Sequence, residues 1–247
     1  MHTDSQIQHL VDGYGNWVQQ GGENKAGSCA FMTKNLYPYS AVFSPIQVNR
    51  MMIKNRVVMA PMGNLNMAEE TGRPNAKMLQ YFFARAKGGC GLLTTGLIPI
   101  SHGIDPTVTE LGKLSTFPRI DRTRTVMAGW RDLAQGVHAF GSRIFVQFTP
   151  GLGRVGPPMC VLTQTKFPKS ASLNPNFYLP CFPLTDVQLD KIVKNCGQAA
   201  ADAKACLLDG VYLHGHEGYL LEQMTNRAFN RRVLGKYADP QRFGIEL

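Results

Sequence analysis

Short apolar runs alternate with longer segments of helical periodicity along this chain. Apolar or β-branched runs of strand length predict strands over residues 55–62, 90–96, 142–148 and 208–214. Apolar residues that recur every three or four positions predict helices over residues 75–89, 123–141 and 185–205, and a short helix or turn over 219–224. A strand followed by a helix therefore repeats four times.

Single residues mark the ends of these elements and the buried side of one helix. Pro61 cannot donate to a sheet ladder and ends the first strand, and Gly88 with Gly89 ends the first long helix. Thr185 followed by Asp186 is the cap signal of the third helix. In the second helix we expect these residues on one side: Val126, Met127, Trp130, Leu133, Val137 and Phe140.

The alternation predicts an α/β fold in which helices cover a parallel sheet, because the strands are almost continuously apolar. Two architectures fit, a doubly wound sheet and a (β/α)8 TIM barrel. No G-x-G-x-x-G follows the first strand, which removes the main support for the dinucleotide-binding form. Polar residues or glycines just beyond the strand ends favour a barrel with its site on the C-terminal face: Gly63, Gly96, Gln147 and His214.

The predicted elements supply about four β/α units, whereas a barrel needs eight strands. A partial barrel has two open edges, so we expect the chain to be the front part of a longer protein. Residues 1–40 have little periodicity and are expected to be an N-terminal extension, while 41–247 form the N-terminal part of the barrel. Residues 151–184 contain six prolines and no regular period, which predicts a long loop over the top of the barrel.

Composition narrows the class of protein. No apolar run approaches the roughly 20 residues of a membrane span, and the start lacks a basic segment followed by an apolar one, so we expect a soluble cytoplasmic protein. The net charge is +9, but the basic residues are spread out and do not alternate with aromatic ones. This pattern favours a solvated surface that attracts anionic small molecules over a nucleic-acid interface.

Six cysteines occur without any C-x-x-C pair, which argues against a structural zinc or iron–sulfur site within the chain. The stretch HGHEGYLLEQ, residues 214–223, is the densest group of reactive side chains. This stretch is either a catalytic site at a strand end or an ordinary polar turn. In the second case His214 is part of the hydrogen-bonded scaffold and Tyr219 anchors the following helix. His214 and His216 would share a strand face that zinc can exploit, but no third ligand cluster supports this reading, and we predict no metal.

Four stretches resemble motifs of the Old Yellow Enzyme family of flavin-dependent oxidoreductases. FSPIQVNRMMIKNRVVMAPM resembles the family's opening strand, and YFFARAKGGCGLLTTG its second unit. VQFTPGLGR is similar to Q-L-x-H-x-G-R without its histidine, and DGVYLHGHEGYLLEQM to D-G-V-E-I-H-x-A-H-G-Y-L-L-x-Q-F. The resemblance covers about residues 41–235 and implies an FMN-binding barrel with NAD(P)H as reductant. An iron–sulfur cluster and FAD are implied only for a longer parent chain, as in the 2,4-dienoyl-CoA and enoate reductases.

The resemblance also assigns cofactor contacts. Main-chain groups of Pro61, Met62 and Gly63 would contact the flavin, although many members carry Thr or Cys where Gly63 stands. Gly96 either lets the flat ring approach the backbone or simply ends its strand. The carboxamide of Gln147 offers a donor and an acceptor, which matches the pyrimidine edge of a flavin.

The remaining assignments concern the substrate. Tyr219 matches the family's proton donor, and His214 matches a residue that hydrogen-bonds the substrate carbonyl. Glu217 stands where the family usually has His or Asn, which favours thioesters or acids as substrates. Arg232 is expected to face a phosphate or carboxylate of the substrate.

Together these motifs predict an FMN-dependent ene-reductase, or NAD(P)H:flavin oxidoreductase, that reduces the C=C bond of α,β-unsaturated carbonyl, acid or thioester compounds. Hydride would come from the flavin N5 and the proton from Tyr219. We expect a small-molecule substrate, no nucleic acid or membrane, and a possible homo-oligomer. The alternative is a catalytically inactive partial barrel or interaction module that lacks the C-terminal flavin-phosphate site.

Overall fold

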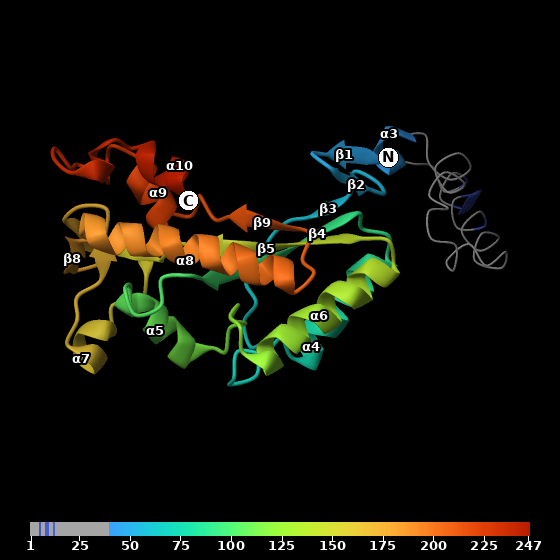
Figure 1. Ribbon diagram of the computed structural model, residues 1–247, viewed down its shortest axis with the longest axis horizontal. Coiled ribbons are helices and arrows are strands. Elements are labelled where there is room, and N and C mark those ends of the chain that lie inside the picture. Colours follow the sequence, from blue (N-terminus) through green and yellow to red (C-terminus); the bar gives the residue numbers. More distant parts are fainter. Residues whose placement is uncertain (1–4, 6–7, 10–11, 13–39) are drawn as a thin grey trace.

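A computed structural model of the chain describes residues 5, 8–9, 12 and 40–247 (Figure 1). The predicted extension over residues 1–40 lies, apart from the few positions just given, outside the described residues. Helix α3 (Ser40–Phe43) and an antiparallel hairpin of β1 (Ile46–Val48) and β2 (Met51–Ile53) open the described fold.

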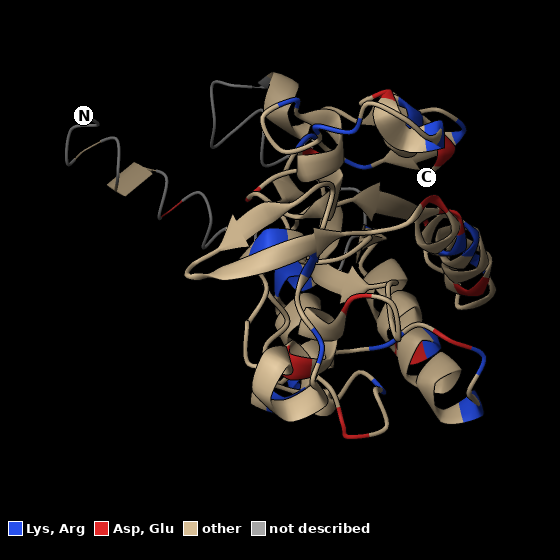
Figure 2. Cartoon of the chain, turned by 90° about the vertical axis from the view of Figure 1, so that its left-hand side faces the viewer, with Lys and Arg blue, Asp and Glu red and all other residues tan. Residues whose placement is uncertain are grey.

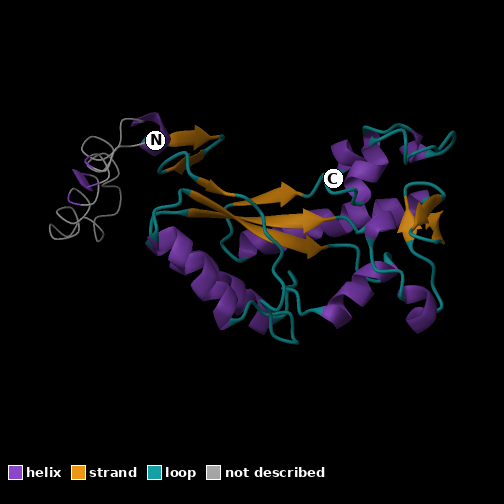
Figure 3. Cartoon of the chain, turned by 180° about the vertical axis from the view of Figure 1, so that it is seen from behind, coloured by secondary structure: helices purple, strands orange, loops and turns teal. Residues whose placement is uncertain are grey.

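The centre of the fold is a parallel four-stranded sheet in the order β3–β4–β5–β9. Its strands are β3 (Val58–Met59), β4 (Leu92–Pro99), β5 (Arg143–Thr149) and β9 (Gly210–Leu213). Strand order follows chain order, and the arrows of these four central strands point the same way in Figure 3. The carboxyl ends of the four strands therefore meet at one edge of the sheet.

Three long helices connect and cover these strands, as the periodicity predicts. They are α4 (Ala76–Lys87), α6 (Arg124–Ala139) and α8 (Asp186–Ala205). Asn75 caps α4 by accepting from the Met78 N–H. Thr185 and Gln188 form a reciprocal capping box at the start of α8, so the predicted cap is confirmed.

The main core lies between these helices and one face of the sheet. Leu93 from β4 and Ile144 from β5 are fully buried against side chains such as Trp130 of α6 and Leu189 of α8. The predicted apolar side of the second helix is confirmed except at Phe140, which is 37% exposed. That residue is the C-cap, where the chain leaves the helix and turns away from the core.

Several short elements depart from the sequence-based expectations. The first predicted strand shrinks to the two residues of β3, and α5 (Pro106–Leu114) was not predicted. The prediction of a long loop over residues 151–184 is wrong. This segment contains the 3-10 turn η2 (Gly153–Val155), helix α7 (Cys160–Gln164) and a three-stranded sheet of β6 (Lys169–Ser170), β7 (Asn174–Asn176) and β8 (Leu179–Pro183).

The C-terminal segment folds back beside α8 (Figure 1). It consists of α9 (Leu220–Thr225), the 3-10 turn η3 (Lys236–Ala238) and α10 (Arg242–Glu246). Tyr237 is fully buried there, and its hydroxyl donates to Asp190 Oδ1 at 2.6 Å. The HGHEG turn, residues 214–218, lies between β9 and α9, and Tyr219 after it is the N-cap of α9.

Charge is dispersed over the described surface. Figure 2 shows basic and acidic segments interspersed on the helices and connecting loops. This arrangement agrees with the expected solvated surface. Within the described part of the chain, no helix is both long and apolar enough to cross a membrane.

Candidate functional site

A hollow of about 270 Å³ opens where the four parallel strands end. Its lining comes from the segments after β3 and β9 and from the C-terminal halves of β4 and β5. The lining residues are Pro61, Met62, Gly63, Leu97, Gln147, His214, His216 and Glu217. Six of the nine predicted site residues therefore meet here, although they come from distant parts of the sequence.

Gln147 is held at the floor of this hollow by its own strand. It pairs with Leu97 of β4 and Tyr212 of β9, and its N–H donates to Thr95 Oγ1 at 3.1 Å. The side chain is 2% exposed, yet its Nε2 has no hydrogen-bond partner among the described residues. A buried amide without a partner is costly, so this group is suited to a ligand that accepts from it.

His214 occupies the first position after β9. Its N–H donates to Phe148 O at 2.9 Å, and its side chain is 2% exposed. Burial, assisted by the neighbouring His216, lowers the pKa of His214, so the neutral imidazole is favoured. Nδ1 of His214 also lacks a partner among the described residues, and Nε2 lies 3.5 Å from Glu217 Oε2.

Tyr219 does not line the hollow but packs on His214, which does. The two rings meet edge to face with their centroids 4.6 Å apart. Burial, and to a lesser extent the charge of Glu217, raises the pKa of Tyr219. Since a free tyrosine already titrates near pH 10, the phenol stays protonated at neutral pH.

A left-handed turn brings Glu217 back toward His214. Glu217 has φ 64° and Gly218 has φ 73°. The Gly218 N–H donates to Glu222 Oε2 at 2.7 Å, and Gln223 Nε2 donates to the Gly218 carbonyl at 2.5 Å. A glutamate rarely adopts this conformation without cost, so tertiary contacts must hold the turn.

Gly96 does not line the hollow. A Cβ at this position would lie 1.9 Å from the Met62 carbonyl oxygen, and the Gly96 N–H donates to Asn64 Oδ1 at 3.3 Å. The close approach of the segment that carries Pro61 to Gly63 therefore requires a glycine at position 96. This packing accounts for Gly96 without any ligand. A flavin contact at Gly96 remains a prediction.

The structure does not bring Arg232 to the hollow. Its guanidinium donates to Asp186 Oδ1 at 3.1 Å, to Ala171 O at 2.7 Å and to the carbonyl of Leu184. Desolvation lowers the pKa of Arg232, and its contacts link the segment before α10 to the start of α8. The Arg232 guanidinium thus joins these segments of the chain by hydrogen bonds. Its expected contact with the substrate is not supported by this geometry.

Three residues of the site were not singled out as contacts from the sequence. Leu97 and His216 line the hollow. Asn64 follows the lining residue Gly63 in the chain, is 1% exposed and has its Nδ2 unpartnered among the described residues. Asn64 follows the A-P-M-G stretch directly. The sequence offered one signal for Asn64: it is a polar residue next to a stretch that was already assigned to the site.

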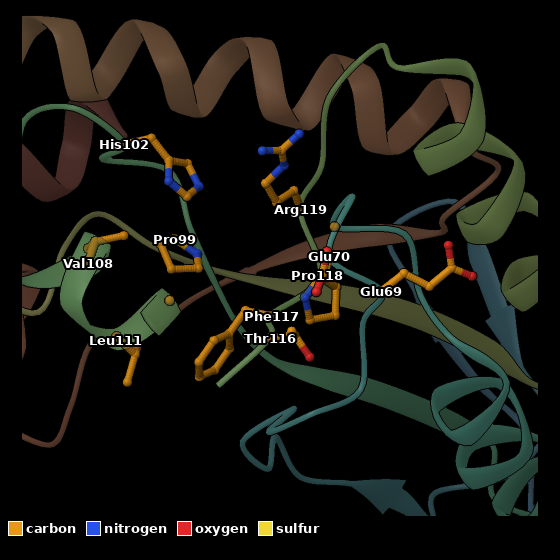
Figure 4. A pocket seen from close by; sticks show the side chains of 12 residues that line it. Glu69, Glu70, Pro99, His102, Val108, Leu111, Thr116, Phe117, Pro118 and Arg119 are labelled. Carbon is orange, nitrogen blue, oxygen red and sulfur yellow. The ribbon is translucent and has the colours of Figure 1, made fainter. Parts of the chain in front are cut away.

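A second hollow, of about 380 Å³, lies apart from the first and shares no residue with it. Figure 4 shows His102 and Arg119 on one rim and Leu111 and Phe117 across from them. It is formed by the loop after β3, the end of β4 and the loop after it, α5, and the segment that follows α5. The sequence did not indicate this hollow.

Comparison with known proteins agrees with this geometry. The family model described as NADH:flavin oxidoreductase / NADH oxidase matches residues 41–244. Cinnamate reductase of Clostridium sporogenes is 35% identical over 199 residues, which are 79% of this chain and 29% of that protein. NADH oxidase of Thermoanaerobacter brockii is 32% identical over 211 residues, or 83% of this chain and 31% of that protein.

Among solved structures, the Old Yellow Enzyme from Pichia sp. AKU4542 superposes with a TM-score of 0.70 at 25% identity, covering 83% of this chain and 54% of that one. The chain thus spans about three tenths of the two relatives and about half of this structure. The predicted fold class is confirmed: the four β/α units form part of an α/β barrel. This chain belongs to the NADH:flavin oxidoreductase / NADH oxidase family, in which the Old Yellow Enzymes are found.

Proposed function

We propose that the chain carries the substrate-binding part of an FMN-dependent reductase that reduces the C=C bond of α,β-unsaturated carbonyl, acid or thioester compounds, with NAD(P)H as the reductant. The observation that carries this proposal is the hollow at the strand ends. Two nearly inaccessible nitrogens, Gln147 Nε2 and His214 Nδ1, find no partner in the part of the chain that the structure describes, and both belong to residues that line the hollow. Unmatched polar groups in a hollow are what a polar ligand can satisfy.

The residues present fit FMN. The Gln147 carboxamide can donate from Nε2 and accept at its oxygen, as the pyrimidine edge of a flavin requires. Pro61, Met62 and Gly63 would lie along the ring system, since they line the same hollow. FMN, when bound, supplies the hydride that the reduction needs.

The substrate would be held and protonated by the residues after β9. An imidazole N–H of neutral His214 would donate to the substrate carbonyl oxygen and draw charge away from the double bond. Tyr219 would give its phenolic proton to the α-carbon as the hydride arrives at the β-carbon, so that the two additions saturate the bond. Glu217 would orient His214 from 3.5 Å.

The relatives support the substrate class. The name cinnamate reductase denotes action on an α,β-unsaturated acid. The name NADH oxidase supports a nicotinamide as electron source. The chain spans only a part of each relative, so substrate, reductant and cytoplasmic location stay proposals for this protein.

The test is a Tyr219→Phe substitution in the FMN-loaded chain. Loss of the phenolic proton should slow reduction of the unsaturated substrate by about 100-fold or more, while reduction of the flavin by NAD(P)H is nearly unchanged. Stopped-flow measurement of the two half-reactions separates them. Tyr178→Phe is the control, because Tyr178 is fully exposed. Equal losses in both half-reactions would exclude Tyr219 as the proton donor.

A second candidate function has its own observation. The end strands of the sheet leave Val58 of β3 55% exposed and Tyr212 of β9 47% exposed. Such open edges suit an interaction module, or a partial barrel without a flavin-phosphate site. Titration of the chain with FMN discriminates the two, since the module predicts no saturable change in flavin fluorescence.

A further inference from the structure

The HGHEG turn gathers three metal-ligating side chains at one point. One ligand atom each from His214, His216 and Glu217 lies within 4.8 Å of the other two. The sequence argued against a metal because no third ligand was evident. The left-handed turn at Glu217 supplies that third ligand by reversing the chain.

The three side chains differ in exposure. His214 is 2% exposed and packs edge to face against Tyr219. The side chains of His216 and Glu217 are 65% and 60% exposed. Zinc ligands stand about 2.0–2.2 Å from the ion, so tetrahedral ligand atoms are roughly 3.5 Å apart. The two exposed side chains have room to rotate toward the buried imidazole, which would bring the ligand atoms from within 4.8 Å to this spacing.

A buried ring nitrogen without a hydrogen-bond partner among the described residues indicates that a ligand can bind here. His214 lines the hollow, and its Nδ1 has no partner among the described residues. The glutamate is near both rings, at 3.5 Å from His214 Nε2 and 3.9 Å from His216 Nδ1. By contrast, the ring of His138 is already engaged, with Nε2 2.6 Å from Asp209 Oδ2.

The geometry points to a binding site for a divalent transition metal of the Zn²⁺ class, formed by His214, His216 and Glu217. Two histidines and a glutamate are a ligand set that zinc uses with a fourth position left open. All three residues line the hollow, so the open position faces it. A water molecule or the oxygen of a small ligand would occupy that position.

This site overlaps the substrate position of the proposed function. An ion bound there would coordinate His214, whose imidazole is proposed to donate a hydrogen bond to the substrate carbonyl. Zinc should therefore inhibit the reductase in competition with the unsaturated substrate. This consequence rests on the proposed function, whereas metal binding does not.

Binding can be measured on the untagged full chain after removal of metal with a chelator. Co²⁺ is added first, because its visible absorbance reports coordination by protein ligands, and Zn²⁺ is then titrated against a chromogenic chelator. We expect one ion per chain at this site. His216→Ala and Glu217→Gln should each weaken Zn²⁺ binding by about 10-fold or more.

The matched control is His102→Asn, which removes an exposed histidine that lies in the other hollow. It should leave the Zn²⁺ affinity unchanged, and circular dichroism checks that each variant is folded. Absence of the Co²⁺ absorbance, or equal affinity in the parent chain, H216A and E217Q, would overturn the site. Zinc binding without inhibition would retain the site and count against the proposed substrate position of His214.

Discussion

At the scale of single residues, Gly96 shows how the backbone near the site is assembled. Any side chain there would collide with backbone atoms of Met62 and Asn64, which are not free to swing away. The chain that carries the Pro61–Gly63 wall of the hollow therefore lies directly on β4. The glycine acts on the site through this close packing.

Gly96→Ala should destabilise the fold by about 1–3 kcal/mol, because the added methyl overpacks a region bounded by main chain. Denaturant unfolding followed by circular dichroism measures the change. Gly197→Ala is the control, since nothing lies within 4 Å of a Cβ there. It lies in α8 and should stabilise by about 0.5–1 kcal/mol. Equal effects of the two substitutions would contradict the packing argument.

Polar residues at strand ends were good guides to the site, and isolated charged residues were not. Gln147 and His214 were predicted from their positions after apolar runs, and both line the hollow. Arg232 was predicted to face a phosphate or carboxylate of the substrate, but its guanidinium is engaged with Asp186 and with carbonyl groups. A long side chain has many reachable partners, so its sequence position alone does not determine its contact.

At the scale of elements, α5 and α7 are joined through one carboxylate. Glu110 of α5 is 4% exposed, and its Oε1 accepts from Thr163 Oγ1 at 2.5 Å, Gln164 Nε2 at 2.6 Å and Lys113 Nζ at 2.9 Å. These hydrogen bonds, led by that of Thr163, lower the pKa of Glu110 to about 2. The carboxylate thus links two elements that the sequence did not predict.

Because the pKa of Glu110 is lower in the folded than in the unfolded chain, its contribution to stability is full above the unfolded pKa of 4.5 and is lost as the pH falls toward about 2. The difference in thermal midpoint between the parent chain and Glu110→Gln should therefore shrink between pH 4.5 and pH 2. Calorimetry across this range measures it. A difference independent of pH would show that the charge of Glu110 is not what joins the helices.

Long elements were predictable and short ones were not, for a physical reason. Helices α4, α6 and α8 run for three turns or more, so their periodicity repeats often enough to be read. Strands β6 to β8 have two to five residues, include prolines, and exist because they pair with each other. Their stability is tertiary, so local sequence carries little sign of them.

At the scale of the whole molecule, the sheet is covered unevenly. One face packs on the three long helices, whereas the end strands β3 and β9 carry the exposed side chains of Val58 and Tyr212. Unpaired edges with apolar side chains are sites of association with another chain or segment. The expected homo-oligomer would form through these strands.

Tyr212→Lys should reduce self-association, since a charged side chain at an open edge disfavours strand pairing. Sedimentation velocity over a range of concentrations should show the parent chain shifting to larger species while the variant stays smaller. Leu162→Lys is the control, because Leu162 is 78% exposed on α7, away from the sheet edges. A parent chain that is monomeric throughout would disprove association through these edges.

The sequence by itself determined the alternation of strands and helices, the barrel class and the strand ends that carry polar groups. The elements and their ends are local properties, because periodicity, caps and strand terminators act over a few residues, and the barrel class followed from the order of the elements and of the motifs. Only the tertiary structure decided which side chains share the hollow. The left-handed turn at Glu217 depends on contacts of Gln223 with Gly218, and the placement of Pro61 to Gly63 depends on the approach of Met62 to Gly96. Contacts between distant segments set both, and no local pattern encodes them.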